Sequence, residues 1–427
     1  MELLHIGTAS ADITPPVGVE LCGYGMYLRR ASTAVLDRLY ARALYAENGA
    51  GRALVIANDL CGVTDELTAR TRDLCADKLG LAAESLMLAC THTHSGPATM
   101  RIHGMGERDL LYYDHLPYLW LDLARAAIEN AQPAVLRIAR GPIKTVGVDR
   151  HDPQGPVDAE LRVARFDAEN RCLALLVNYS AHAVVLGASS TLISADWPGA
   201  LSRTIEAQLP RTMGLFVQGS CGTLNSITAC VDAKAGANAV EEIGRDVARE
   251  ALRLAETAEC MEGNATVAAS RQVVPLETQL TPPDELAAEH AACLERVADP
   301  DLGAYEQNVN RLRAAACQRL LDTYVTGPPD AYPAEVQALR IGPLRIVGIP
   351  GELFMSLGQR ILDARQNGLT MVAGYANDWM GYFPTRDAYG DPRYIYPAEQ
   401  AQMLQARFPY RPGESERLIE AAIALGR

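Results

Sequence analysis

The sequence is poor in the features that mark several large classes of protein. Its 427 residues contain no uninterrupted apolar run of about 18 residues, the length from which a membrane-spanning helix is inferred. Basic side chains number 39 against 52 acidic ones, and the formal net charge is −13. Binding to nucleic acid and adsorption to anionic lipid both need a basic surface. We therefore expect no nucleic-acid partner and no stable membrane insertion.

Paired cysteines and a leader segment are lacking as well. The ten cysteines are scattered without a C-x-x-C pair. The first residues have neither the basic region nor the apolar region of a secretory signal peptide. From these two absences we predict reduced thiols and a cytoplasmic location. Neither absence predicts an oligomeric state.

Strand and helix patterns alternate along the chain. Short apolar runs typical of buried strands lie at 52–60 and 85–91, and helical patterns follow them at 64–80 and 110–132. A hairpin pattern lies at 159–182. This order favours strands assembled into a sheet with helices packed on it. We predict an α/β fold with a mixed sheet core and flanking helices.

Residues 284–322 differ from the rest of the chain. They have the pattern of two charged helices interrupted at Asp299-Pro300, and strand patterns resume at 334–354. Because the strand pattern continues on both sides, we predict a helical insertion within a single domain that spans residues 1–427.

Two of the eight histidines stand one residue apart at the end of an apolar run. His92 and His94 fall where the strand pattern at 85–91 ends. Alternate residues of a strand point to the same side, so the two imidazoles can share one face. Loops beyond strand ends commonly carry the chemistry of α/β proteins. Two hydrogen-bonded structural histidines would produce the same pattern.

Two further donors follow buried-strand patterns elsewhere. His182 follows one such pattern, and Glu352 follows another after a Pro-Gly turn, where a helix is expected to begin. A lone histidine there is commonly structural, and a carboxylate in a first helical turn also stabilises the helix dipole. Taken with His92, however, these residues provide the three nitrogen and oxygen donors of an open catalytic zinc site. Zn²⁺ is the predicted cofactor.

Several short motifs occur in the order seen in a known enzyme family. They are ADITPPVGVELCGYG, THTHSGP, NYSAH, SADWPG, IPGE and GYANDWMGYFPTRDAY. In these motifs, from about residue 5 to about residue 400, the chain resembles the catalytic domain of the neutral, non-lysosomal ceramidases and their bacterial relatives. The resemblance implies a zinc-dependent hydrolase that cleaves an amide bond by attack of zinc-bound water.

The resemblance also implies the metal ligands, and the chemistry of the reaction suggests a proton carrier. It assigns the ion to His92, His182, Glu352 and Tyr382. His94 corresponds to the second histidine of the family's H-x-H motif, near the metal, and is a reasonable carrier of the proton that the leaving amine needs.

Two more residues receive catalytic roles in the same way. Arg150 corresponds to an active-site arginine, and Tyr394 to a tyrosine that contacts the reacting carbonyl. The alternatives are an ion pair of Arg150 with Asp152 or Asp158, and simple packing of the Tyr394 ring.

The chain also departs from the family pattern. Asn225 stands where family ceramidases have a serine beside the amide of the substrate; an amide side chain can still donate a hydrogen bond to an oxyanion. Family members are usually secreted or membrane-anchored and carry a C-terminal immunoglobulin-like domain, whereas neither a signal peptide nor such a domain is expected here. Aromatic residues make up only 6% of the chain. We expect a small-molecule or lipid-like amide substrate, smaller or more polar than ceramide.

Three other functions remain open from the sequence. A zinc site of this kind could hydrolyse an ester, a lactone or a sugar-linked amide. Ser220 and Cys221 lie in a glycine-flanked loop and could serve a serine or thiol hydrolase if a histidine activated them. A closed site would instead indicate a non-enzymatic metal-binding protein.

Overall fold

The computed structural model describes residues 3–24, 29–144, 146–169, 171–261, 265–364 and 368–425. These residues form three larger sheets. Each sheet combines antiparallel strand pairs with one parallel pair. The predicted α/β fold with a mixed core is therefore confirmed, with three mixed sheets rather than one.

Each large sheet is built mainly from strands that are close in sequence. The first has the order β5-β4-β3-β1-β6, with β1 (His5–Asp12), β3 (Tyr40–Glu47), β4 (Arg52–Asn58), β5 (Leu86–Cys90) and β6 (Gln132–Pro133). The second has the order β12-β10-β9-β7-β14, with β7 (Val135–Pro142), β9 (Glu160–Ala168), β10 (Arg171–Tyr179), β12 (Met213–Gln218) and β14 (Glu259–Cys260). The third has the order β15-β16-β17-β19, with β15 (Val267–Glu277), β16 (Ala331–Ile341), β17 (Leu344–Gly348) and β19 (Leu369–Ala373).

The described ranges also contain three short two-stranded pairs. They are β2 (Ala34–Val35) with β11 (Leu192–Ile193), β8 (Gly147–Asp149) with β13 (Leu224–Ser226), and β18 (Glu352–Leu353) with β20 (Tyr382–Phe383). The β8–β13 pair contains Asn225, and Arg150 directly follows β8. The β18–β20 pair contains Glu352 and Tyr382.

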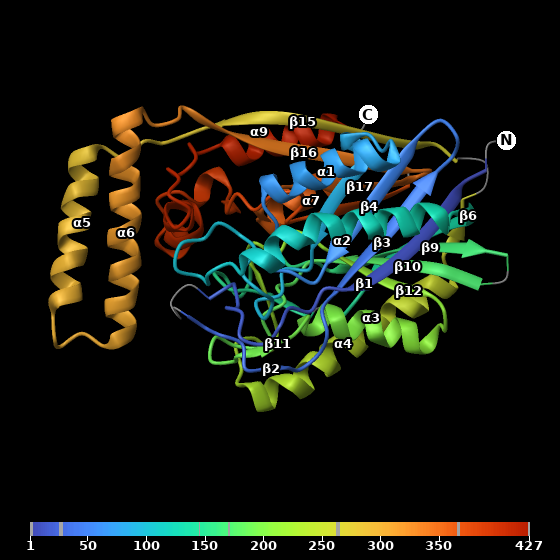
Figure 1. Ribbon diagram of the computed structural model, residues 1–427, viewed down its shortest axis with the longest axis horizontal. Helices are drawn as coiled ribbons and strands as arrows, with labels where there is room; N and C mark the ends of the chain where they lie inside the picture. Colours follow the sequence, from blue (N-terminus) through green and yellow to red (C-terminus); the bar gives the residue numbers. More distant parts are fainter. Residues whose placement is uncertain are drawn as a thin grey trace.

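Helices cover the outer faces of the sheets (Figure 1). They are α1 (Asp65–Leu79) and α2 (Leu110–Glu129) over the first sheet, α3 (Asp196–Gln208) and α4 (Ala233–Glu256) over the second, and α7 (Met355–Asp363) and α9 (Glu414–Ala424) on the third. The start and stop signals of α1 act as expected: Thr64 Oγ1 accepts from Leu67 N at 3.2 Å, and Gly80 ends the helix in the left-handed conformation. None of the helices in the described ranges has the length and apolar character that crossing a bilayer requires.

The inner faces of the three sheets share one apolar core. Ile6 and Leu44 of the first sheet, Phe166 of the second, and Leu339 and Ile346 of the third belong to the same buried cluster. Burial of this much apolar surface from three sheets holds their strand ends in fixed relative positions.

The predicted helical insertion is confirmed as a hairpin of two helices, α5 (Pro283–Ala298) and α6 (Ala304–Thr326), which lies between β15 and β16. Figure 1 shows it standing at one end of the molecule, clear of the three sheets. It packs against α8 (Ala401–Met403) and the loop around Phe408 through a small apolar cluster. The hairpin is thereby positioned beside the segment that follows β20.

Candidate metal centre

The three predicted donors lie just beyond the carboxyl ends of strands that belong to parallel pairs. His92 lies two residues after β5, and His182 lies three residues after β10. Glu352 follows β17 and forms part of β18, so the expectation that it lies in a first helical turn is wrong; α7 begins only at Met355. Such strand ends are the usual place of ligand sites in α/β proteins.

Glycines allow the chain to approach closely around Glu352. A Cβ on Gly351 would stand 2.4 Å from the carbonyl oxygen of Gly381, and a Cβ on Gly222 would stand 2.7 Å from that of Glu352. Separations under about 3 Å are not sterically possible, so both positions require glycine. The Pro-Gly turn before Glu352 therefore serves to bring β18 against β20 and the loop at Gly222.

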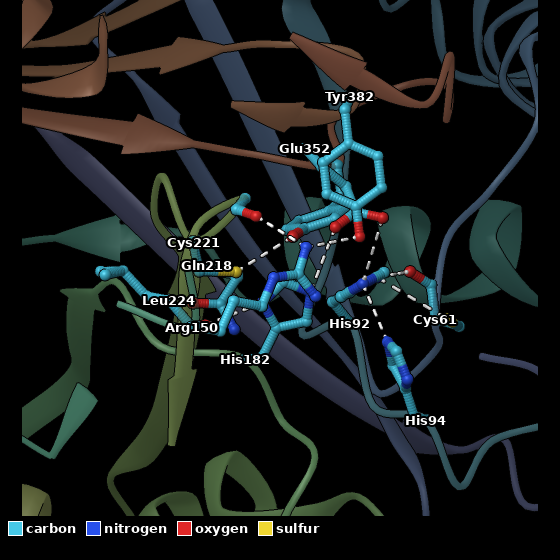
Figure 2. Close-up of polar contacts among 12 residues, drawn as sticks. Cys61, His92, His94, Arg150, His182, Gln218, Cys221, Leu224, Glu352 and Tyr382 are labelled. Atoms are coloured by element: carbon cyan, nitrogen blue, oxygen red, sulfur yellow. Dashed lines mark hydrogen bonds and ion pairs between the residues drawn. The ribbon is translucent and has the colours of Figure 1, made fainter. Parts of the chain in front are cut away.

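The structure brings the three donors together in one buried cluster (Figure 2). His182 Nε2 lies 3.1 Å from Glu352 Oε2, and His92 Nε2 lies 3.7 Å from Glu352 Oε1. One ligand atom from each residue lies within 4.8 Å of the others. Zinc–nitrogen and zinc–oxygen bonds of about 2.0–2.2 Å are compatible with donors spaced in this way.

The hydrogen bonds on the far side of both imidazoles fit a metal site. His92 Nδ1 lies 2.6 Å from the carbonyl oxygen of Cys61, and His182 Nδ1 lies 2.8 Å from that of Leu224. A carbonyl oxygen can only accept, so each Nδ1 carries a hydrogen, and a ring without a second proton has a lone pair on the Nε2 that faces Glu352. Metal-binding histidines commonly have this arrangement. The donor set therefore suits a divalent metal ion.

Burial and mutual charge set the protonation of the cluster. Burial lowers the pKa of His92 to about 4, so its ring is neutral at pH 7. Burial lowers the pKa of His182 but Cys221 and Glu352 raise it, to about 10. Burial likewise raises the pKa of Glu352, and His92, His182 and Arg150 outweigh that effect and hold it at about 2. The charged His182–Glu352 pair would release a proton when a metal ion binds.

Two aromatic residues that sequence reasoning missed complete the surroundings. Trp379 Nε1 donates to Glu352 Oε1 at 3.1 Å, and the ring of Tyr375 stacks on His92 with a centroid separation of 3.9 Å. Both lie in the motif GYANDWMGYFPTRDAY, which signalled the region without showing which side chains point inward.

His94 contacts the same cluster from the side of the cavity. Its Nε2 lies 3.0 Å from His92 Nε2, and its Nδ1 is buried with no hydrogen-bond partner in the described part of the chain. Burial lowers the pKa of His94 well below its usual value, so the ring is neutral. Cys61, His92 and His94 form a second group whose donor atoms lie within 4.8 Å of one another.

Arg150 lies inside the cluster and not in either of the ion pairs considered above. Its Nη2 donates to the carbonyl oxygen of Gly222 at 2.8 Å and to the hydroxyl of Tyr382 at 2.9 Å. Asp158 pairs with Arg162, and Asp152 pairs with Arg393. Those alternatives for Arg150 are therefore wrong. Burial lowers the pKa of Arg150, but nearby Tyr382 and Glu352 raise it by more than burial lowers it. The net shift is upward, so the guanidinium stays cationic.

Tyr382 is held beside the donors by the β18–β20 pairing, in which it stands opposite Glu352. Its hydroxyl points toward the cluster and accepts from Arg150 (Figure 2). Burial raises the pKa of the Tyr382 phenol well above its usual value, so the hydroxyl is neutral. Its assignment as a fourth metal ligand stays a prediction.

A cavity of about 330 Å³ opens beside the cluster. The described residues that line it on the side of the metal centre are Tyr24, His94, Arg150, His182, Asn225, Tyr382 and Tyr396. Elsewhere its wall is largely apolar and consists of Met105, Val184, Val309, Leu312, Ala316, Met403 and Leu404 together with the polar or small residues Gly23, Cys230, Arg313 and Gln400. Because His182 and His94 border this space, the site is open to a ligand, unlike the closed site of a metal-storage or structural protein.

Tyr394 lies outside this cavity wall, contrary to its expected contact with a substrate carbonyl. Its ring packs at 4.9 Å from His151 and at 5.5 Å from Phe354. Tyr396, two residues further on, lines the cavity and contacts the Tyr382 ring at 5.8 Å. The 3₁₀ turn Pro392–Tyr394 and the single π-helical turn Tyr396–Gln400 set these directions, and neither turn has a clear sequence signal.

The side chains considered for a thiol or serine hydrolase are buried away from the cavity. Cys221 is fully buried and its Sγ lies 3.0 Å from the hydroxyl of Tyr375. Ser220 is 1% exposed, and neither residue belongs to the cavity wall. A substrate in the cavity would not reach either nucleophile.

A sequence profile described as "Neutral/alkaline non-lysosomal ceramidase, N-terminal" matches residues 4–241, more than half of the chain. The chain belongs to this family. It is 26% identical to the neutral ceramidase of Pseudomonas aeruginosa and 22% identical to neutral ceramidase B of Dictyostelium discoideum, and each match covers 91% of this chain and 68% of the relative. The expected resemblance is thus confirmed.

Solved ceramidase structures share the fold. The crystal structure of the Pseudomonas aeruginosa neutral ceramidase matches with a TM-score of 0.75 over 100% of this chain and 74% of that chain, and a structure described as "Ceramidase complexed with C2" matches with a TM-score of 0.76 over 100% and 75%. Sequence identity in both is 19%, so they support the architecture alone. The protein is thus a hydrolase-family member with a ceramidase-like fold and a cluster of possible metal ligands.

Proposed function

We propose that this protein is a zinc-dependent hydrolase that cleaves the amide bond of a small lipid-like substrate. The observation that carries the proposal is the convergence of His92, His182 and Glu352 beside an open, largely apolar cavity. Family membership and the relatives named as neutral ceramidases support the reaction type.

In this proposal His92, His182 and Glu352 hold the ion, and Tyr382 completes the ligand set. A zinc ion bound there would act as a Lewis acid and lower the pKa of water toward about 7. The neutral hydroxyl of Tyr382 and the cation of Arg150 are already joined by a hydrogen bond, which keeps both groups directed at the same place.

The remaining residues act on the amide itself. Arg150 is cationic and buried, so it is placed to stabilise the negative charge that develops on the carbonyl oxygen. His94 is neutral and borders the cavity, so it can accept a proton and deliver it to the amine nitrogen as the carbon–nitrogen bond breaks. Asn225 lies across from Val148 in the β8–β13 pair and presents an amide that can orient the substrate.

The cavity also narrows the class of substrate. Its volume lies at the lower end of the range of about 300–1,000 Å³ typical of small-molecule sites, which favours a small substrate. Its apolar wall suits an acyl chain. The wall does not support the expectation of a substrate more polar than ceramide. An ester or lactone of similar shape is the alternative, because the same groups would stabilise its carbonyl oxygen.

Metal removal provides the test of this function. The purified protein is expected to hydrolyse a fluorogenic N-acyl amide, to lose this activity after dialysis against a chelator, and to recover it when Zn²⁺ is restored. Metal content is measured by mass spectrometry alongside the rates. Full activity in a preparation shown to contain no metal would refute the proposal.

The two neighbouring tyrosines offer a second test. Tyr396→Phe removes a hydroxyl from the cavity wall and is expected to lower kcat by about 10²-fold if that hydroxyl donates to the carbonyl oxygen. Tyr394→Phe keeps the ring that packs on His151 and Phe354 and should change kcat little. The reverse order of effects, with Tyr394→Phe the slower enzyme, would restore the role that the sequence assigned to Tyr394.

A further inference from the structure

The helical insertion supplies one wall of the cavity. Four residues of α6 line it: Val309, Leu312, Arg313 and Ala316. The same cavity is also lined by His94, His182 and Arg150 of the candidate metal centre. A substrate whose amide lies at the metal centre can therefore also contact α6.

Arg313 gives this wall a positive charge. Among the described lining residues two are arginines and none is an aspartate or glutamate, although the whole chain has 52 acidic and 39 basic side chains. Arg150 is occupied with Gly222 and Tyr382 inside the catalytic cluster. Arg313 is the cation on the α6 side, where the neighbouring side chains are mostly apolar. Charge interactions are stronger in such partly desolvated surroundings than in water.

A carboxylate outside the cavity wall holds Arg313 in place. Its Nη2 lies 2.6 Å from Oε1 of Glu289 on α5, and the two side chains are 38% and 36% exposed. Glu289 does not belong to the cavity wall. A guanidinium has five N–H donors in a planar fork, so one carboxylate oxygen does not use them all. The pair orients the guanidinium and partly offsets its charge.

We propose that Arg313 is a specificity-determining residue that binds a carboxylate at the end of the substrate remote from the scissile amide. The preferred substrate is then an amide with an apolar chain that ends in a carboxylate. The apolar residues Val309, Leu312, Met403 and Leu404 contact the chain, and the guanidinium fork matches the two oxygens of the terminal group. Cleavage of the amide rests on the function proposed above, whereas the anion subsite rests on the cavity wall alone.

Binding of product-like probes tests the subsite without requiring turnover. The purified full chain is titrated calorimetrically with α,ω-dicarboxylic acids of increasing chain length and with their monomethyl esters. At the best length the diacid is expected to bind about tenfold more tightly than the monoester, the size of one charge-assisted hydrogen bond. R313Q should bring this ratio close to one. E289Q, which removes the competing carboxylate, should increase the ratio.

Arg311 provides the matched control. It lies on the same helix and its Nη1 donates to Asn308, but it is exposed and outside the cavity wall. R311Q is therefore expected to keep the wild-type ratio. A ratio near one for wild type at every chain length, or an equal loss in R311Q and R313Q, would overturn the subsite.

Kinetics separate this subsite from the proposed reaction. Two amides that differ only in a terminal carboxylate or its methyl ester should show the same kcat in wild type, with the lower KM for the carboxylate, and R313Q should raise only that KM. If wild type binds the diacid more tightly yet cleaves neither amide, the proposed reaction fails and the subsite stands. If both amides are cleaved with equal KM, the subsite fails and the reaction stands.

Discussion

Replacement of His182 by alanine is expected to remove the copurifying metal and to lower kcat for amide hydrolysis by at least about 10³-fold. His182 Nε2 faces the carboxylate of Glu352 while its Nδ1 is fixed by the carbonyl of Leu224, so the substitution removes a donor that is already oriented toward the ion. Lewis-acid catalysis contributes several kcal/mol, and each 1.36 kcal/mol corresponds to a tenfold change in rate. Metal content by mass spectrometry and steady-state kinetics measure the two effects.

A histidine outside the cluster serves as the control for this substitution. His115 is exposed on α2, and His115→Ala should leave metal content and kcat unchanged. Loss of His182 also removes one of the partners of the buried Glu352, which destabilises the fold. Glu352→Gln keeps the shape of the side chain and tests the same ligand set if His182→Ala does not fold. Full zinc occupancy in a folded variant of either kind would contradict the proposed ligands.

Replacement of Arg150 by alanine is expected to lower kcat by about 10²–10³-fold with the metal retained. This is the usual effect of removing one group that stabilises an oxyanion. Arg150 borders the cavity, and among the proposed ligands in the described part of the chain it hydrogen-bonds to Tyr382 alone. Its loss should therefore change catalysis more than metal binding. Parallel measurement of kcat and metal content distinguishes the two.

Two companions make this second result specific. Arg150→Lys keeps the positive charge but loses the fork that engages Gly222 and Tyr382 together, so kcat should be intermediate. Arg393→Ala removes an exposed arginine that pairs with Asp391 and should leave kcat unchanged. If Arg150→Ala instead releases the metal while the fold is intact, Arg150 supports the ligand set and its assignment to the carbonyl oxygen is wrong.

Patterns that depend on neighbouring residues were predictable from the sequence. The capped helix at 65–79, the hairpin of β9 and β10, and the helical insertion follow from local periodicity, caps and turns. The expectation for Glu352 was wrong because pairing between β18 and β20 places the residue in a short strand and not in the first turn of a helix. That pairing joins segments about thirty residues apart and has no local signal.

The assignments of Tyr394 and Arg150 show a further reason. The spacing of residues 392–400 does not reveal that a 3₁₀ turn and a π turn direct Tyr396, and not Tyr394, to the cavity. For Arg150, nearby acids in the sequence suggested an ion pair, yet these acids are already engaged by Arg162 and Arg393. Partner choice among charged groups is decided in space and not by proximity along the chain.

By itself, the sequence determined the family, the α/β class with its inserted helices, and the three donors. The donors were predictable because a residue that follows a buried strand keeps its chemistry and its place at the strand end in any packing of the sheets. Only the tertiary structure decided that these donors share one site with Trp379 and border a small apolar cavity that α6 helps to enclose. A cavity is the space left between segments distant in sequence, and its volume and charge depend on how three sheets and a helical hairpin pack together.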